Sequence, residues 1–295
     1  MTEHSSGDAV LGPNRYGKAE TRVVHIDRRA DGDVLTDLNV SIALSGDLTD
    51  SHLRGDNAHV LPTDTQKNTV YAFARDGVGA PETFAMRLAR HFVATQAPIT
   101  AAVVDVEGFG WERLAVHSFR RAGTEVRTAR VEHDARGTLV VSGLRDLVVL
   151  NTTDSEFAGF ATDRYTTLAP TGDRVLATAI DARWRCAAEA ESGAETDEWD
   201  ARYVRVRDCL LAAFTGTYSW ALQQTLFAMG ARVIAEVPEV VEVRLALPNR
   251  HHVLVDLTPF GLDNPNAVYS APDRPYGLIE AAVLRDGTVA DPRSW

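Results

Sequence analysis

Apolar residues in the first half of the chain alternate with polar residues in some stretches and recur every three to four residues in others. Alternation predicts half-buried strands, and a recurrence near 3.6 residues predicts amphipathic helices. The polar sequence ADGD at residues 30–33 joins two alternating stretches, which is a hairpin signal. The predicted elements are, in order, strands at 21–29 and 34–47, helices starting at Thr63 and at Pro81, and strands at 99–114 and 127–144.

The second half of the chain predicts the same order of elements. An acidic loop at 188–198 precedes the first of its helices. Because no residue-level identity links the halves, only the order of elements forms the repeat. We expect a flexible tail at 1–14, a first unit at 15–140 and a second unit at 141–295. The predicted elements are strands at 144–153 and 173–187, helices from about Trp199 to Phe214 and at 220–237, and strands at 240–247, 251–257 and 276–284.

The composition is typical of a globular protein and argues against two classes of partner. Hydrophobic residues make up 45% of the 295 residues and charged residues 24%. The 30 Lys and Arg residues against 41 Asp and Glu residues give a net charge of −11. Nucleic acid is therefore not expected as the main partner, because phosphate recognition needs a basic face. No apolar run is long enough to span a bilayer, so no membrane partner is expected either.

The chain ends and the cysteines predict a cytoplasmic protein. The N-terminal residues lack the apolar core of a signal peptide. The C-terminal residues are Arg293-Ser294-Trp295, which is not the Ser-Lys-Leu peroxisomal signal. Cys186 and Cys209 have neither a metal-ligand spacing nor a disulfide framework, so we interpret them as reduced.

Motifs for common cofactors and metals do not fit their required contexts. The Gly-x-Gly of DGVGAPE, residues 76–82, follows a predicted helix and lacks a third glycine in register, which argues against a dinucleotide site. The sequence contains neither a P-loop nor a Gly-x-Ser-x-Gly elbow. His251 and His252 are adjacent on a predicted strand and would point to opposite faces, away from a common metal ion. We therefore expect no metal and no organic cofactor.

Thr63 lies at the start of the first predicted helix, after the polar stretch that begins at Gly55. Gln66 follows it by three residues, a spacing that fits a capping box. In that motif the Thr63 hydroxyl accepts a hydrogen bond from a free helix amide, and Gln66 reaches back to the cap. Taken alone, Thr63 is therefore interpreted as a structural cap.

Asn249 and His251 form a second local pattern. Strand alternation places both side chains on one face, with Arg250 on the other. A histidine suits proton transfer near neutral pH. The spacing therefore predicts that Asn249 and His251 share a site.

Six segments spread over nearly the whole chain match one family in the family's order, and together they are specific. The chain resembles urate oxidase (uricase). The resemblance implies an α+β fold of two tandem T-fold (tunnelling fold) units, each an antiparallel four-stranded sheet with two helices on one face. The segments are RYGK at 15–18, GDNAHVLPTDTQKNTVY at 55–71, HSF at 117–119, EFAGFATDRYTTLAPTGDR at 156–174, LQQTLFAMG at 222–230 and LPNRHH at 247–252.

The resemblance implies a catalytic proton relay of Lys18, Thr63 and His251. In the family the lysine of RYGK is catalytic, the threonine of TDT is its partner, and the histidine extends the relay. A lysine acts as a base only when neutral, and burial lowers its pKa toward that state. Without the resemblance, Lys18 is interpreted as a solvated lysine before a strand.

The resemblance also implies a set of substrate-binding residues. Arg174 offers a rigid fork of donors, and Gln223 offers a donor beside an acceptor, which together suit the edge of an oxypurine anion. Phe157 supplies a flat ring for stacking on the purine. Taken singly, each of these side chains has an ordinary structural interpretation. The implied binding residues are Thr63, Asp64 and Leu222 (the last two through backbone amides), Phe157, Arg174, Gln223, and Asn249, which would hold O2 or water.

The activity that the resemblance implies is cofactor-free oxidation of urate by O2 to 5-hydroxyisourate and hydrogen peroxide. It also implies a homotetramer in which the Thr-Asp pair and the Arg-Gln-Phe group of one site come from neighbouring subunits. Two alternatives stay open at this point. One is another T-fold enzyme acting on a purine or pterin, which would need a glutamate anchor and, for a cyclohydrolase, a Cys/His zinc site. The other is a non-catalytic purine-binding module.

Overall fold

The structure is a computed structural model that describes residues 9–187 and 196–294. Most of the predicted acidic loop and the first eight residues of the predicted tail lie outside the described residues. Contacts between Cα atoms divide the chain into two units. One consists of Met1–Arg120 with Thr128–Val140, and the other of Arg121–Arg127 with Val141–Trp295.

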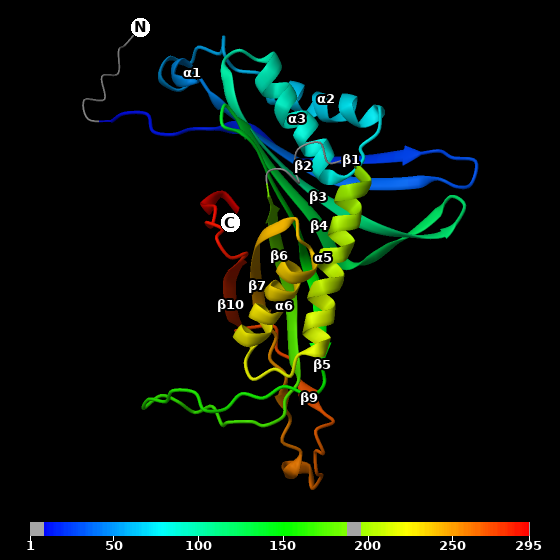
Figure 1. The fold of residues 1–295 in the computed structure, drawn as a ribbon, viewed down its shortest axis with the longest axis vertical. Helices are drawn as coiled ribbons and strands as arrows, with labels where there is room; N and C mark the ends of the chain where they lie inside the picture. The colour runs from blue at the N-terminus through cyan, green and yellow to red at the C-terminus, as the bar shows by residue number, and fades with distance from the viewer. Residues whose placement is uncertain (1–8, 188–195, 295) are drawn as a thin grey trace. The chain divides into compact units, whose positions relative to one another are not determined.

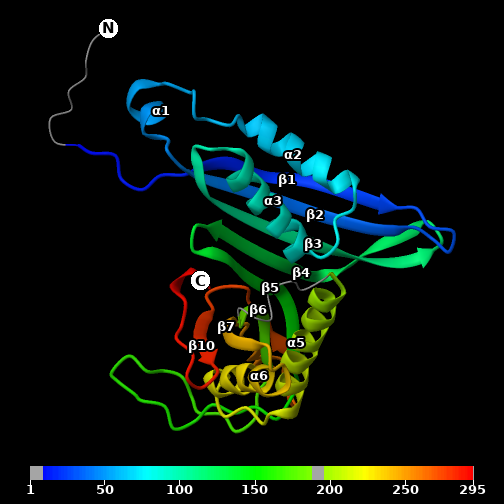
Figure 2. The same cartoon turned by 45° about the horizontal axis from the view of Figure 1, so that its top comes forward.

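The first unit contains a sheet in the order β1-β2-β3-β4, and β2 is antiparallel to both β1 and β3. Helices α2 and α3 lie on one face of this sheet (Figures 1 and 2). The predicted order of two strands, two helices and two strands is confirmed, and a short helix, α1, was not predicted. The elements are β1 Tyr16–Asp27, β2 Val34–Gly46, α1 Thr49–Arg54, α2 Thr63–Arg75, α3 Pro81–Thr95, β3 Ile99–Ala115 and β4 Ser118–Asp134, which crosses the division between the units.

Alternation along β2 sets the orientation of the first sheet. Leu38, Val40, Ile42 and Leu44 are all buried, and they alternate with residues of the opposite face. A strand places every second side chain on the same face, so these four residues form the sheet side of the core. The predicted apolar stripe of α3 (Phe84, Leu88 and Phe92) is buried and supplies the helix side.

The second unit contains a sheet in the order β5-β6-β7-β10, with antiparallel neighbours, and α5 and α6 lie on one face of it (Figure 1). The predicted run at 127–144 is divided by a turn into β4 and β5. The elements are β5 Gly137–Asn151, β6 Leu176–Cys186, α5 Thr196–Gly216, α6 Leu222–Glu236, β7 Val240–Asn249, β8 Val253–Leu254, a 3-10 turn at Thr258–Phe260, β9 Tyr269–Ser270, β10 Gly277–Leu284 and a 3-10 turn at Pro292–Ser294.

The predicted strand at 251–257 is confirmed only at Val253–Leu254. Asn249, the last residue of β7, pairs with Gly277, the first residue of β10, so the chain beyond Asn249 has no partner on that side of the sheet. Only Val253–Leu254 is extended, and it pairs with Tyr269–Ser270 in a separate two-stranded ribbon. Apolar residues recur at every second position in this segment, but a strand also requires a neighbouring strand with which its backbone can form hydrogen bonds.

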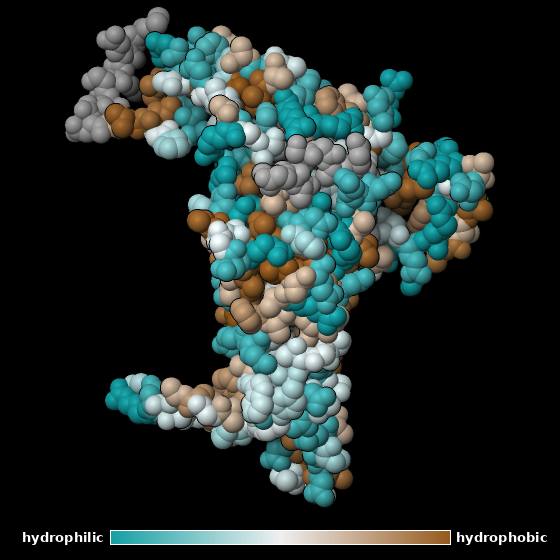
Figure 3. All heavy atoms as spheres, in the orientation of Figure 1, coloured by the Kyte–Doolittle hydropathy of each residue, from teal (hydrophilic) through white to brown (hydrophobic). Residues whose placement is uncertain are grey.

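The core of the second unit is closed by large aromatic side chains. Trp184 of β6 and Trp199 and Phe214 of α5 are at most 2% exposed. Cys186 and Cys209 are buried and are not joined in a disulfide, and burial raises the pKa of the Cys209 thiol to about 11. Polar and apolar residues are interspersed over the face shown in Figure 3. No helix among the described residues is long and apolar enough to cross a membrane.

Strand β1 contains a bulge directly after Lys18. Its pairing with β2 shifts register between Lys18 and Thr21, and Glu20 adopts a left-handed conformation with φ of 57°. The amide of Glu20 donates a hydrogen bond of 2.9 Å to Oγ of Ser41 on β2. A non-glycine residue at positive φ is uncommon, and here the hydrogen bond to the neighbouring strand holds it.

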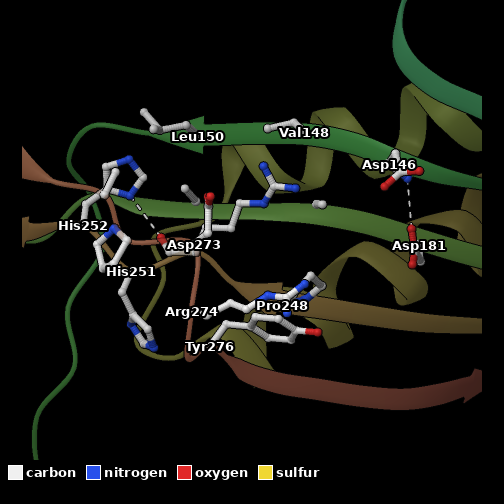
Figure 4. A pocket seen from close by; sticks show the side chains of 15 residues that line it. Asp146, Val148, Leu150, Asp181, Pro248, His251, His252, Asp273, Arg274 and Tyr276 are labelled. Atoms are coloured by element: carbon white, nitrogen blue, oxygen red, sulfur yellow. Dashed lines mark hydrogen bonds between the residues drawn. The ribbon is translucent and has the colours of Figure 1, made fainter.

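Strand β5 of the second unit contains the same irregularity. Its pairing with β6 shifts between Leu144 and Leu147, and Asp146 has φ of 59°. The amide of Asp146 donates a hydrogen bond of 2.9 Å to Oδ1 of Asp181 on β6 (Figure 4). Burial raises the pKa of the Asp181 carboxyl above its ordinary value.

The two bulges align residue by residue, GKAET at 17–21 with GLRDL at 143–147. The halves therefore share this local conformation in addition to their element order, although only Gly17 and Gly143 are identical in the two stretches. In the alignment Lys18 corresponds to Leu144, which is 1% exposed in the core of the second unit. Lys18 thus occupies a position that faces the helices of its own unit, where its counterpart packs in a core.

Gly17 is required by the close approach of β1 to β2. A Cβ atom at this position would lie 1.7 Å from the carbonyl oxygen of Ile42. We expect Gly17→Ala to lower the free energy of unfolding by about 1–3 kcal/mol, because the clash is with backbone and cannot be relieved by a rotamer change. The measurement is the thermal unfolding midpoint.

The matched control is Gly216→Ala, at the end of α5, where an added Cβ meets nothing within 4 Å. This variant is expected to match the wild type or exceed it slightly, because alanine favours a helix over glycine. Equal midpoints for both variants would contradict the steric account of Gly17.

Candidate functional site

A cavity of about 650 Å³ in the second unit brings together predicted site residues from three segments of the chain. Phe157 and Arg174 come from the segment between β5 and β6, and Leu222 and Gln223 from the start of α6. Among the described residues that line it are six of the predicted ones, namely Phe157, Arg174, Leu222, Gln223, Asn249 and His251. The cavity also has an apolar wall of Leu168, Val253, Leu254 and Ile279, and Tyr269 adds a phenol ring.

Backbone hydrogen bonds hold Phe157 and Arg174 beside each other. Phe157 forms an isolated antiparallel bridge with Thr171, with hydrogen bonds of 2.9 and 3.0 Å. The amide of Arg174 donates to the carbonyl of Ser155 at 2.8 Å. The Arg174 guanidinium carbon consequently lies 5.4 Å from the Phe157 ring centroid, and burial lowers the pKa of Arg174 below its ordinary value. The pair presents a cation and a flat ring to the same cavity.

The start of α6 provides free backbone donors at the cavity. The helix begins at Leu222, and Ala221 before it supplies no side-chain cap. The carbonyl of Ala221 accepts from the amides of Gln224 and Thr225, which leaves the amides of Leu222 and Gln223 without a helical acceptor. The Leu222 side chain is buried in the core, so only its backbone is available to a ligand. Free amides at a helix start attract an anion.

The geometry at Asn249 and His251 differs from the predicted strand. Strand β7 ends at Asn249, so alternation does not extend to His251, and that argument was wrong. The two residues nevertheless line the same cavity, whereas Arg250 does not. The amide of Arg250 donates to the carbonyl of Ala177 at 2.8 Å, which fixes the turn of the chain.

A second cavity of about 560 Å³ borders the same turn of the chain (Figure 4). Arg250 lines it, together with Asp181, Asp273, Arg274 and other residues. His251 and His252 border both cavities, so the prediction that they point to opposite faces of a strand is wrong. Nδ1 of His252 lies 3.0 Å from the carbonyl oxygen of Arg250.

The start of α2 in the first unit holds Thr63 and Asp64, both exposed. The helix begins at Thr63 as predicted, but the capping box is wrong: Pro62 is the N-cap residue, and no side chain caps the helix. Gln66 is fully buried and donates through Nε2 to the carbonyl of Leu61 at 3.3 Å instead of reaching back to a cap. The Thr63 hydroxyl is therefore not used as a cap.

Neighbouring side chains hold the Asp64 carboxylate along the helix surface. Lys67 donates to Oδ1 at 2.5 Å and Asn68 to Oδ2 at 2.9 Å. The hydrogen bond and the charge of Lys67 lower the pKa of Asp64 most, and the charge of Lys18 contributes as well. Lys18 therefore lies near enough to Asp64 for its charge to reach that carboxyl, although its effect is the smallest of these. Lys18, Thr63 and Asp64 belong to the first unit and are not among the described residues that line the cavity of the second unit.

Tyr16 fastens the strand of Lys18 to the segment before Thr63, and the sequence reading did not identify it. Its hydroxyl donates to the carbonyl of Leu61 at 3.1 Å, the same oxygen that accepts from Gln66. Tyr16 lies two residues before Lys18 on β1, on the same face of the strand. The one available signal was its place in RYGK, between Arg15 and the required Gly17.

The described part of the chain contains no group of three or more His, Cys, Asp or Glu residues that could hold a metal ion. The second cavity does hold several such side chains, among them Asp146, Asp181 and His252. They do not converge on one point, and Asp181 accepts the Asp146 amide.

Comparisons with known proteins give a consistent result over the whole chain. The uricase family model matches residues 14–132 and 140–280. The chain is 49% identical to the uricase of Arthrobacter globiformis, over 99% of this chain and 96% of that protein. It is 34% identical to the uricase of Danio rerio, over 92% of this chain and 93% of that protein.

Solved structures confirm the predicted fold class. The crystal structure of the Arthrobacter globiformis uricase covers 96% of this chain and 98% of its own, with a TM-score of 0.92. The uricase of Bacillus fastidious, 23% identical, covers 93% of this chain and 94% of its own with a TM-score of 0.78. The two units therefore form the tandem T-fold of these enzymes, and the chain belongs to the uricase family.

Proposed function

We propose that the cavity of the second unit binds urate and that the chain, a urate oxidase and hence an oxidoreductase, converts it with O2 to 5-hydroxyisourate and hydrogen peroxide. The observation that carries the proposal is the gathering of Phe157, Arg174, Leu222, Gln223, Asn249 and His251 around one cavity. These residues are the ones expected to grip a purine, stack on it and hold its co-substrate. Membership of the uricase family supports the same substrate.

In the proposed complex, urate lies flat against Phe157. The Arg174 guanidinium donates to a carbonyl oxygen and the adjacent ring nitrogen, and the Gln223 amide pairs with another edge of the ring. The free amide of Leu222 adds a neutral donor. A cation, a helix start and a partly apolar wall together favour a planar organic anion over a small inorganic one.

Proton transfer is assigned to Lys18, Thr63 and His251. A neutral Lys18 amine accepts the substrate proton through the Thr63 hydroxyl, and His251 extends the relay. The position of Lys18 supports this role, because its counterpart in the second unit, Leu144, packs in a core and Lys18 itself is only partly exposed. The Thr63 hydroxyl is free to relay because it does not cap its helix.

The electrons come from the urate dianion itself. Two electrons and two protons convert O2 to hydrogen peroxide, and the oxygen of one water molecule becomes the 5-hydroxyl group of the product. Urate, O2 and water therefore balance 5-hydroxyisourate and hydrogen peroxide. Asn249 lines the cavity, and its proposed role is to hold O2 or that water over the ring.

We also propose that the active site is shared between subunits of a homotetramer. Thr63 and Asp64 of one subunit would face the cavity of its neighbour and supply the hydroxyl and a backbone amide. Both residues are exposed, and the amides of Thr63 and Asp64 precede the first helical hydrogen bond, from Gln66 to Pro62, which supports this arrangement. A cytoplasmic location stays a prediction.

The test measures urate absorbance and O2 concentration together in protein that has been dialysed against a strong chelator. Loss of urate matched by equal O2 uptake, with full activity retained, is the expected result. Urate binding without O2 uptake would instead indicate a purine-binding module. Activity that is lost on dialysis and returns with a metal would contradict a cofactor-free reaction and favour a metal-dependent T-fold enzyme.

A further inference from the structure

We infer that Ser155 is a positioning residue that determines which edge of the Arg174 guanidinium faces the ligand. The inference rests on the proposed urate site and adds a residue that the family resemblance did not assign. Ser155 does not line the cavity among the described residues, so any effect on the substrate must pass through Arg174.

Ser155 contacts both the backbone and the side chain of Arg174. Its carbonyl oxygen accepts from the Arg174 amide at 2.8 Å, and its hydroxyl oxygen accepts from Arg174 Nε at 3.2 Å. Ser155 is fully buried, at 0% exposure, so water cannot replace its hydroxyl as the acceptor. One residue therefore fixes both the backbone and the head group of Arg174.

The bond to Nε decides what Arg174 can offer a ligand. A guanidinium has two bidentate edges, a side edge of Nε with one Nη and an end edge of both Nη atoms. Ser155 occupies the side edge through Nε. Neither Nη atom of Arg174 has a hydrogen-bond partner within the described residues. The end edge is consequently the one available to an acceptor pair, such as a carbonyl oxygen beside a deprotonated ring nitrogen.

Ser155 is itself held by a buried bridge to the segment before α6. It pairs with Ser219 in a parallel bridge, flanked by hydrogen bonds from Glu156 N to Ser219 O (2.8 Å) and from Ser219 N to Asp154 O (2.9 Å). The hydroxyl of Thr225, on α6, donates to Oγ of Ser219 at 2.8 Å. Ser155, Ser219 and Thr225 are each 0% exposed.

This bridge connects the two groups of residues that are proposed to bind the purine. Arg174 and Phe157 are anchored on one side of it, and Leu222 and Gln223 belong to the helix on the other. A change at Ser155 therefore alters the aim of the guanidinium first, and none of the relay residues Lys18, Thr63 and His251 is replaced. The expected consequence is weaker ground-state binding with little change in chemistry.

The test compares Ser155→Ala and Ser155→Cys with the wild type in urate kinetics. Alanine removes the acceptor, and cysteine keeps nearly the same volume while replacing it with a weak one. Both variants are expected to raise KM roughly tenfold, as for a lost hydrogen bond to a charged group, with kcat within about twofold. Ser142→Ala is the matched control, a buried serine on β5 that lines neither cavity, and it should retain the wild-type KM.

A double-mutant cycle with Arg174→Lys distinguishes an effect of Ser155 on the orientation of the Arg174 guanidinium from a general effect on the structure of the site. A lysine side chain has no Nε–H donor for Ser155, so adding Ser155→Ala to Arg174→Lys should leave KM unchanged within about twofold. Equal fold increases in both backgrounds would overturn the inference, as would an unchanged KM in Ser155→Ala and Ser155→Cys. A wild type and a Ser142→Ala variant that fail to oxidise urate would instead refute the proposed function.

Discussion

Replacing Lys18 by methionine is expected to lower the turnover number by roughly 10²–10⁴-fold, the range for loss of a general base, while urate binding stays near that of the wild type. Methionine keeps the length and apolar stem of lysine but cannot accept a proton. The measurements are kcat under saturating urate and, in the absence of O2, the dissociation constant of urate. Retained turnover together with lost binding would show that Lys18 binds the substrate and is not the base.

The composition of the chain provides a matched control for this experiment. Only two lysines, Lys18 and Lys67, occur among its 30 basic residues, and the other 28 are arginines. Arginine stays protonated in proteins and cannot serve as a base, whereas lysine can. Lys67→Met removes the other lysine, which pairs with Asp64 on the surface of α2, and is expected to keep kcat within about threefold of the wild type, as for an exposed ion pair.

Arg174→Ala should affect urate binding more than turnover, the opposite of what is expected for Lys18→Met. It removes the cation of the cavity and leaves Lys18 in place, so the loss should appear mainly in KM and in urate binding. By analogy with broken buried charge pairs, the cost is about 3–5 kcal/mol in kcat/KM. A large fall in kcat at saturation, with binding unchanged, would reverse the roles given to the two residues.

Much of the fold follows from hydrophobic periodicity, because most elements bury one face. Leu38, Val40, Ile42 and Leu44 alternate in sequence and lie together in the core, and Pro81 begins its helix as expected. Hydrophobic periodicity did not predict the structure where the presence of a neighbouring strand decides whether a segment joins the sheet. The segment 251–257 alternates, but β10 begins at Gly277, opposite Asn249, and offers it no partner, so the segment leaves the main sheet.

The bulges show a second limit of reading the sequence. The shared conformation of Glu20 and Asp146 depends on a side chain of the neighbouring strand, Ser41 in one unit and Asp181 in the other. Neither acidic residue is of the type that signals positive φ most strongly, since glycine and asparagine do so. The repeat became visible only after the register of each strand pair was known.

The residues of the candidate site that belong to sequence motifs could be predicted from the sequence. The residues that hold them in position could not. The segments around Arg174, Gln223 and Asn249 gave residues that line one cavity. Ser155 acts through Arg174, and Tyr16 through the carbonyl of Leu61. Hydrogen bonds to a backbone carbonyl or to a buried hydroxyl produce no spacing pattern in the sequence. Residues such as Ser155 and Tyr16 are therefore recognised only in the folded structure.

The proposed sharing of the active site between subunits predicts how mixtures of inactive chains behave. Thr63→Ala removes the relay hydroxyl from one side of the proposed site, and Arg174→Ala removes the cation from the other. Each variant alone should be nearly inactive, because every site in a uniform assembly carries its lesion. Chains of the two variants, unfolded together in equal amounts and reassembled, should regain activity.

The expected recovery follows from symmetry. A two-fold pair of subunits carries two equivalent sites, each built from both chains. In a mixed pair one site receives both lesions and the other receives none. Random mixing makes about half of the pairs mixed, so about a quarter of all sites are intact. Activity should therefore return to roughly a quarter of that of wild-type chains treated in the same way.

The control for this experiment is a mixture in which both lesions lie on the same side of the site. Arg174→Ala mixed with Gln223→Ala should not recover, because each chain of a pair then contributes a damaged cavity. Mass measurements must show that subunits have exchanged in both mixtures. If the Thr63→Ala and Arg174→Ala chains exchange and no activity returns, every site has kept one lesion, and Thr63 acts within its own chain.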